Sequence, residues 1–236
     1  MPSEKQIDDR LENVLHIIYL LFNEGYYSTT QNQILRKDLC FEAMHLGLLL
    51  TGFPQTNKPK TNALMALMCF HSSRFEARQN ENNVFILYEN QDETLWNQEL
   101  IEQGKYFLDL SANGNEISSY HLEAGIAFWH CQKEETREKW ENILHHYELL
   151  SQINDSPSVA LNRVFALYKL KGWQAALPEA EKLQLTNSHF YFTLLGELYK
   201  YSDYDKAKQN FETAFGMAKT QSDKQILKEK MENLKK

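Results

Sequence analysis

The sequence predicts an all-α protein of stacked antiparallel helical hairpins, and three features of its composition lead to this prediction. The 236 residues include 32 Leu but only 4 Val, and Leu favours helices whereas Val favours buried strands. Only 9 Gly and 5 Pro are present, so few residues interrupt a helix. Hydrophobic residues make up 42% of the chain, which excludes a disordered protein and allows a sizeable core. A large parallel sheet is excluded by the scarcity of Val.

Helical periodicity defines the first three elements. Residues 7–25 place Leu11, Leu15 and Ile18 at helical spacing, and Gly25 ends the pattern. A second helix is predicted over 34–50, and the Gly-Phe-Pro sequence at 52–54 ends it. A third begins after Pro59 and continues to residue 75. Short loops between such helices predict antiparallel pairs.

One stretch departs from helical periodicity. Turn-forming residues fill positions 79–83, and the run Val84-Phe85-Ile86-Leu87-Tyr88 that follows is the most strand-like in the chain. We therefore expect one small β-hairpin near residues 79–90.

The remaining helices are predicted over 93–110, 117–132, 136–154, 158–171, 173–183, 189–201, 205–219 and 223–234. We expect an N-terminal helical part, residues 1–115, which carries the hairpin, and a second part of helical hairpins, residues 116–236. The two parts are expected to pack as one continuous unit.

Weak internal repetition marks the last third of the chain. Ala176 and Ala207 lie 31 positions apart in similar surroundings, close to the period of a helix-turn-helix repeat. The second copy matches the tetratricopeptide (TPR) pattern with one residue missing between its helices; the matching residues are Leu195, Gly196, Tyr199, Ala207, Phe211 and Ala214. Small residues at these positions let two helices cross closely, so we expect TPR-like hairpins suited to binding a protein.

Charge and cysteine content exclude several classes of function. With 25 Lys+Arg against 32 Asp+Glu, the chain lacks the basic excess that nucleic-acid binding requires. Its 3 Cys are far apart and form no CxxC pair, which argues against a zinc ribbon or a redox dithiol. Residues 1–6 lack the apolar stretch of a signal peptide, and no run approaches 18 apolar residues. We therefore expect a cytoplasmic protein that does not enter a membrane.

No motif predicts catalysis. The sequence lacks a phosphate-binding loop, a dinucleotide fingerprint, a nucleophile elbow and a zinc-protease motif. His145 and His146 are adjacent and so point to different helix faces, and His121 and Glu123 share no face either. We expect no catalytic residues, no metal, no cofactor and no enzymatic activity.

Polar residues inside apolar helical patterns are the candidate functional residues. They form four groups: Asn23, Glu24 and Tyr26; His71, Arg74 and Arg78; Gln91, Asp92 and Trp96; and Asn162 with Arg163.

The arginines of the second group allow two interpretations. On one helix, His71, Arg74 and Arg78 would share a face, and an Arg pair there could hold a carboxylate or a phosphate. We favour the alternative that Arg74 and Arg78 pair with Glu24 or Asp92 and lock the hairpin to the helices. Asp92 could also cap the following helix. For Asn162 and Arg163 we likewise favour a buried capping network over a ligand site.

Six segments in a fixed order also resemble the long C-terminal extension of one group of extracytoplasmic-function (ECF) sigma factors, of the sigma-70 family. They are Val14-Leu15-His16-Ile17-Ile18-Tyr19-Leu20-Leu21-Phe22-Asn23-Glu24-Gly25-Tyr26; Arg36-x-Asp38-Leu39-Cys40-x-Glu42-Ala43; Ala63-Leu64-Met65-Ala66-Leu67-Met68-x-x-His71-x-Ser73-Arg74-x-x-Ala77-Arg78; Gln91-Asp92-x-x-x-Trp96-x-x-x-Leu100-Ile101-x-x-Gly104; Tyr120-His121-Leu122-Glu123-Ala124-x-Ile126-Ala127; and Ser156-Pro157-Ser158-Val159-Ala160-Leu161-Asn162-Arg163. Two positions depart from the family pattern, because Ser72 and Asn90 stand where family members often have Asp.

The resemblance implies a regulatory, protein-binding module in transcription initiation. Family members carry sigma domains that bind core RNA polymerase and promoter DNA, and this chain shows no basic helix-turn-helix. We therefore expect the isolated extension, which contacts the sigma domains of the same polypeptide or core polymerase, and DNA only through those domains. Its acidic charge would suit a basic DNA-reading surface. The alternatives are a stand-alone TPR-like adaptor, or a small-ligand sensor that uses the cluster of Arg74, Arg78 and Asp92.

Overall fold

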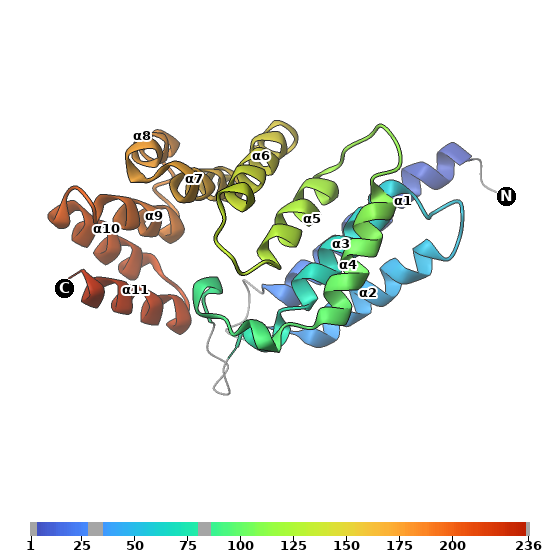
Figure 1. The fold of residues 1–236 in the computed structure, drawn as a ribbon, viewed down its shortest axis with the longest axis horizontal. Coiled ribbons are helices and arrows are strands. Elements are labelled where there is room, and N and C mark those ends of the chain that lie inside the picture. Colours follow the sequence, from blue (N-terminus) through green and yellow to red (C-terminus); the bar gives the residue numbers. More distant parts are fainter. Residues whose placement is uncertain (1–3, 28–34, 80–85, 235–236) are drawn as a thin grey trace. The chain divides into compact units, whose positions relative to one another are not determined.

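The computed structural model describes residues 4–27, 35–79 and 86–234, and these residues form eleven α-helices with no strand among them (Figure 1). The expectation of an all-α protein is therefore confirmed. The chain divides into two compact units, residues 1–134 and 135–236. This boundary falls after the predicted one at 115/116, because the helix that follows residue 116 packs into the first unit.

The first unit surrounds one central helix. Its helices are α1 (Glu4–Tyr26), α2 (Lys37–Thr51), α3 (Pro59–Ser72), α4 (Gln98–Ser111) and α5 (Ser119–His130). α3 packs against the other four, and every residue from Thr61 to Phe70 is buried. A helix that is apolar on all sides is stable only when covered in this way.

Glycines allow the closest approaches within this unit. A Cβ atom at Gly104 of α4 would lie 2.5 Å from Cε1 of Phe70 in α3, and one at Gly25 would lie 2.8 Å from the carbonyl oxygen of Arg36. Both distances are far below van der Waals contact. The close packing of α4 against α3, and of the start of α2 against α1, is therefore possible only because Gly104 and Gly25 have no side chain.

The second unit is a succession of helices, each packed against the next. They are α6 (Arg137–Ile153), α7 (Pro157–Lys171), α8 (Trp173–Leu183), α9 (His189–Tyr199), α10 (Tyr204–Met217) and α11 (Gln221–Asn233). Side chains of Thr136, Ser156, Asp203 and Thr220 cap α6, α7, α10 and α11. Because the first backbone N–H groups of a helix have no partner within it, these caps fix where each helix begins.

Three predicted elements differ from the structure. Residues 80–85, the centre of the predicted β-hairpin, lie outside the described residues, but Tyr88–Asn90 is a short 3-10 helix (η2), so the strand prediction is wrong there. The third helix ends at Ser72, before the predicted residue 75, and a 3-10 helix (η1) follows over Phe75–Ala77. Another 3-10 helix (η3, Glu93–Leu95) precedes α4, which therefore begins five residues later than predicted.

Within the described residues, no helix combines the length and the apolar character needed to cross a lipid bilayer.

Candidate functional site

Five of the candidate residues, together with Tyr88, form two neighbouring groups in the first unit that we call the aromatic–cationic cluster. Its members come from the end of α1, the end of α3, both flanks of η1, and the segment before α4; they are Tyr26, His71, Arg74, Arg78, Tyr88 and Trp96. Tyr88 had not been singled out from the sequence, because it stood inside the predicted strand.

One half of the cluster is built on the ring of Tyr26. The Arg78 guanidinium lies over this ring, with Cζ 3.9 Å from the centroid, and donates a hydrogen bond to the tyrosine hydroxyl. The His71 ring lies 4.5 Å from the same centroid, and the Phe22 ring lies 5.7 Å away. Gly25, which precedes Tyr26 in α1, lets the start of α2 lie directly against this end of α1.

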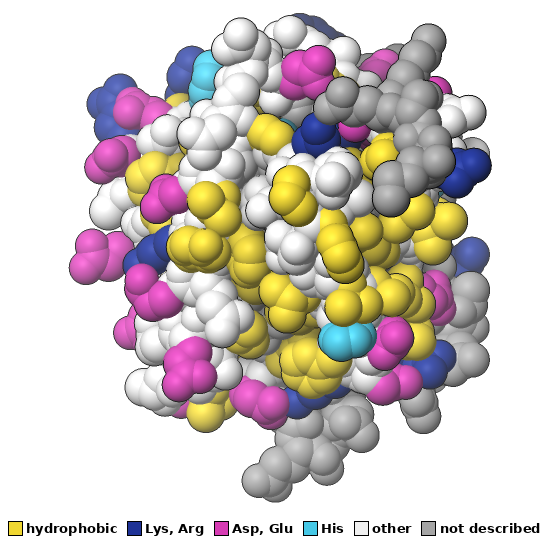
Figure 2. Space-filling model, turned by 90° about the vertical axis from the view of Figure 1, so that its right-hand side faces the viewer, with side chains coloured by type: hydrophobic (Ala, Val, Ile, Leu, Met, Phe, Trp, Pro, Cys, Tyr) yellow, Lys and Arg dark blue, Asp and Glu magenta, His cyan; other side chains and the backbone are white. Residues whose placement is uncertain are grey.

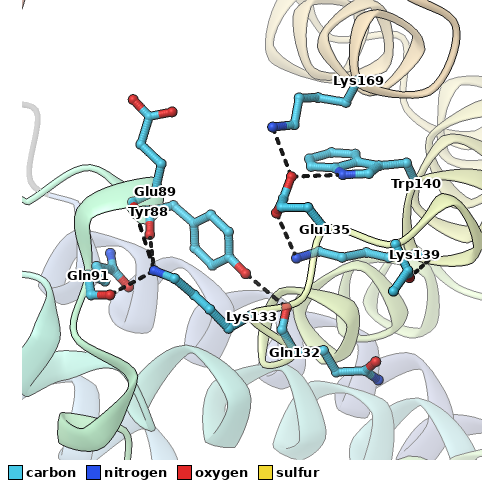
Figure 3. A network of polar contacts seen from close by, with 10 residues as sticks. Tyr88, Glu89, Gln91, Gln132, Lys133, Glu135, Lys139, Trp140 and Lys169 are labelled. Carbon is cyan, nitrogen blue, oxygen red and sulfur yellow. Dashed lines mark hydrogen bonds and ion pairs between the residues drawn. The ribbon is translucent and has the colours of Figure 1, made fainter.

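The other half is built on the ring of Tyr88. Arg74 places its Cζ 5.4 Å from the ring centroid, and the rings of His130 and Trp96 lie 5.1 and 6.2 Å away. The Tyr88 hydroxyl donates a 3.0 Å hydrogen bond to the carbonyl of Gln132 (Figure 3).

Lys133 fastens the segment that carries Tyr88. Its Nζ donates to the carbonyl oxygens of Tyr88, Glu89 and Gln91 at 3.3, 3.4 and 2.7 Å (Figure 3). Three acceptors match the three hydrogens of an ammonium group, so Lys133 acts here as a structural clamp.

The electrostatic environment of the cluster is cationic. Burial lowers the pKa of His71 well below its ordinary value, and Arg74, Arg78 and His130 lower it further. Burial also lowers the pKa of Arg78. His71 is therefore neutral near pH 7, and the groups that act on it are all cations or potential cations.

Arg74 is the most unusual member. Only 6% of its surface is exposed, its Nε is buried without a hydrogen-bond partner, and no carboxylate of the described residues forms an ion pair with it. The predicted pairing with Glu24 or Asp92 is therefore wrong for Arg74. Both acids are exposed, and Asp92 accepts hydrogen bonds from the backbone N–H and the hydroxyl of Thr94 at 2.9 and 2.7 Å.

Asp92 caps η3 only, and Asn97 caps α4 by accepting from the N–H of Leu100 at 3.0 Å. Gln91 is buried and donates to the Ile86 carbonyl at 3.3 Å, whereas its Oε1 has no partner. Asn23 is half-buried, and its backbone carbonyl accepts a 2.9 Å hydrogen bond from the N–H of Tyr27.

The remaining candidates lie in the second unit and do not join the cluster. Asn162 is exposed, and Arg163 pairs with Glu179 at 3.8 Å. The expected buried capping network is wrong, because Ser156 already caps α7 by accepting from the N–H of Val159.

Two networks were not singled out from the sequence. In the first unit, the Tyr19 hydroxyl donates to Oε2 of Glu123 at 2.9 Å, and burial raises the pKa of Glu123 to about 7. The signal for this network in the sequence was an acidic residue, Glu123, among the apolar residues of α5.

The second network centres on Glu135. Its carboxylate accepts from Lys139 at 3.1 Å, from Nε1 of Trp140 at 2.9 Å and from Lys169 at 2.8 Å (Figure 3). The side chain of Lys139 is 0% exposed. Burial opposes the charge of Glu135, but the hydrogen bonds from the two lysines outweigh it and lower its pKa. This network ties α6 to α7.

The described residues contain no group of three or more His, Cys, Asp and Glu side chains placed to hold a metal ion. Cys40, Cys69 and Cys131 are all free thiols, and burial raises the pKa of Cys40 and of Cys69 to about 12. At neutral pH these two thiols are protonated and unreactive.

Comparison with known proteins adds one family and one relative. Residues 10–112 match a family of unknown function, DUF6596. An uncharacterized protein of Rhizobium meliloti (strain 1021) is 33% identical over 238 residues, which cover 99% of this chain and 56% of the relative. No solved structure matches the chain. The chain is thus similar to DUF6596 across most of its first unit, and it spans just over half the length of the curated relative.

Proposed function

We propose that this chain is the non-enzymatic, regulatory part of an ECF sigma factor and acts by binding protein in the cytoplasm. The partner is either the sigma domains of the same polypeptide or core RNA polymerase. DNA would be contacted only through sigma domains that are not part of this sequence.

The observation that carries the protein-binding role is an exposed apolar face on the first unit. Large hydrophobic side chains of α1 and α2 remain exposed after folding; they are Val14, Ile17 and Leu20 on α1, and Phe41, Leu48 and Leu49 on α2. α1 and α2 pack side by side, and Figure 2, which shows the right-hand side of Figure 1, displays hydrophobic side chains gathered across this part of the surface. Contiguous apolar surface of this kind is typical of an interface.

The sigma-factor assignment rests on the six ordered sequence segments. Its support from the structure is that residues from three of these segments meet in one place: Tyr26, His71 with Arg78, and Trp96 all belong to the aromatic–cationic cluster. The net charge of −7 would complement the basic surfaces of sigma domains. The longer relative is compatible with a module that occurs beside other domains.

We also propose that the second unit is TPR-like. α9 and α10 form a tight hairpin in which a Cβ atom at Gly196 would lie 2.7 Å from the Phe211 ring, and Ala207 and Ala214 are 0% exposed. These are the small and aromatic residues that the repeat pattern requires at a close helix crossing.

Substitutions on the apolar face test the proposal. Purified chain is immobilised, and its binding to core RNA polymerase and to recombinant ECF sigma domains is measured separately by biolayer interferometry. We expect Ile17→Glu and Leu48→Glu to weaken binding to one of the two partners by tenfold or more. Ile153→Glu is the matched control, because Ile153 is 53% exposed but lies in the second unit.

Circular dichroism must show that all three variants remain folded. If the unmodified chain binds neither partner, the sigma-factor assignment is wrong. Equal weakening by Ile17→Glu and Ile153→Glu would show that the apolar face is not the interface.

A further inference from the structure

The aromatic–cationic cluster contains more hydrogen-bond donors than acceptors. Nε of Arg74 and Nε1 of Trp96 are buried without partners, and the two residues are only 6% and 5% exposed. Nδ1 of His71 is also buried without a partner. Leaving such groups unsatisfied is costly, since each loses its hydrogen bonds to water on folding.

The charge of the cluster is equally unbalanced. Arg74 carries a permanent positive charge and makes no ion pair with a described carboxylate, and the aromatic ring beneath its guanidinium is that of Tyr88. The charges that act on His71 come from Arg74, Arg78 and His130, with no acid among them. Asp92 lies close to Trp96 along the chain, but it is exposed, and its carboxylate already accepts a hydrogen bond from the N–H of Thr94.

Two other cations at the cluster already have acceptors. The three hydrogen bonds of Lys133 to backbone carbonyls use its ammonium group to hold the Tyr88 segment. Arg78 has the Tyr26 hydroxyl as its acceptor. Of these three cations, Arg74 is the one for which the described residues supply no acceptor. A bound anion would supply it.

We propose that the cluster is a binding site for a small oxyanion, a carboxylate or a phosphate, held by the Arg74 guanidinium. A planar guanidinium forms two parallel N–H···O bonds with either group. Trp96 supplies a further N–H donor beside the same Tyr88 ring. The site would join the end of α3 to the segment before α4, and it does not depend on the partner proposed above.

Thermal unfolding of the full chain tests the site. The chain is heated in a zwitterionic buffer with inorganic phosphate or with acetate, each compared with NaCl at equal ionic strength. We expect one of the two anions to raise Tm by about 3–6 °C at ten times its Kd, and NaCl not to do so. Titration calorimetry gives the Kd, and the anion that binds identifies the ligand as a phosphate or a carboxylate.

Variants assign the effect to these residues. Arg74→Lys keeps the charge but removes the two-pronged geometry, and Trp96→Phe keeps the ring but removes the donor. We expect each to fold and to bind the anion tenfold more weakly or worse. Arg137→Lys is the control, because Arg137 is exposed in the second unit.

Two results would overturn the proposal. One is the lack of any stabilisation by phosphate or acetate beyond that of NaCl. The other is anion binding that Arg74→Lys and Trp96→Phe leave unchanged, which would place the anion elsewhere.

Discussion

Gly196 offers the sharpest test of how the second unit is packed. In Gly196→Ala the new Cβ would lie 2.7 Å from Cδ1 and Cε1 of Phe211 and 2.9 Å from its Cγ. The Phe211 ring is only 1% exposed, so it has no room to withdraw, and either the ring or helix α9 must shift. Forcing one extra methyl group into such a core costs about 1–3 kcal/mol.

A matched glycine separates this cost from helix propensity. Gly→Ala inside a helix gains up to about 1 kcal/mol by itself. Gly216 lies in α10, and a Cβ there would meet nothing within 4 Å. We therefore expect Gly216→Ala to be neutral or stabilising. The difference between the two variants cancels most of the propensity gain and leaves the steric cost, about 1–3 kcal/mol.

Urea unfolding monitored by far-UV circular dichroism measures both variants. Phe211→Leu in the Gly196→Ala background should recover part of the loss, since a smaller side chain makes room for the methyl group. If Gly196→Ala and Gly216→Ala are equally stable within about 0.5 kcal/mol, the close crossing of α9 and α10 is refuted.

Three further predictions concern buried polar groups and one more glycine. Glu135→Ala removes a carboxylate that accepts a hydrogen bond from the buried Lys139, and it should lower the free energy of unfolding by about 1–3 kcal/mol in urea titrations; adding Lys139→Met should recover part of this. Because burial raises the pKa of Glu123 to about 7, the folded chain binds this proton more tightly than the unfolded chain. The protonated Glu123 therefore stabilises the fold fully below about pH 4.5. Up to about 3 kcal/mol of this stabilisation is lost as the pH rises to 7. Glu123→Gln, which cannot ionise, should therefore flatten the dependence of Tm on pH over this range. Gly25→Ala places a Cβ 2.8 Å from Sγ of Cys40 and should cost about 1–3 kcal/mol in urea unfolding; an unchanged midpoint would contradict the tight α1–α2 contact.

The helices could be predicted from the sequence because each carries its own apolar periodicity and its own ends. α8 runs over Trp173–Leu183, which are the predicted bounds, between a glycine with positive φ and a left-handed residue. Short-range signals of this kind do not depend on the rest of the chain.

The predicted hairpin failed where distant residues decide the local structure. Tyr88 has strand propensity, but its ring packs against Trp96 and its backbone carbonyl binds Lys133, which is 45 positions away. Such long-range contacts override local propensity, and no local pattern reveals them. The third helix was predicted too long for a different reason: the hydroxyl of Ser73 bonds to the Phe70 carbonyl where α3 ends.

Five of the six residues of the aromatic–cationic cluster were among the candidates from the sequence, but Tyr88 was missed and the expected pairings of Arg74 were wrong. The many acidic residues of the sequence suggested that Arg74 would form an ion pair with one of them. Asp92 instead accepts a hydrogen bond from the backbone N–H of Thr94, two residues further along the chain. A short polar side chain reaches a nearby N–H at little entropic cost, so local capping wins over distant ion pairs. Only the three-dimensional structure shows that this leaves Arg74 without a carboxylate among the described residues.

At the boundary between the two units, the residues on either side of Glu134 are held in place by hydrogen bonds. Lys133 makes its hydrogen bonds within residues 1–134, and Glu135 makes its bonds within residues 135–236. Glu134, which is exposed, is the one residue between them. A Gly-Ser insertion at this position would lengthen the tether without removing any bond of either anchor. Each unit thus holds its own end of the connecting segment, and the two ends can be moved apart in sequence without loosening either one.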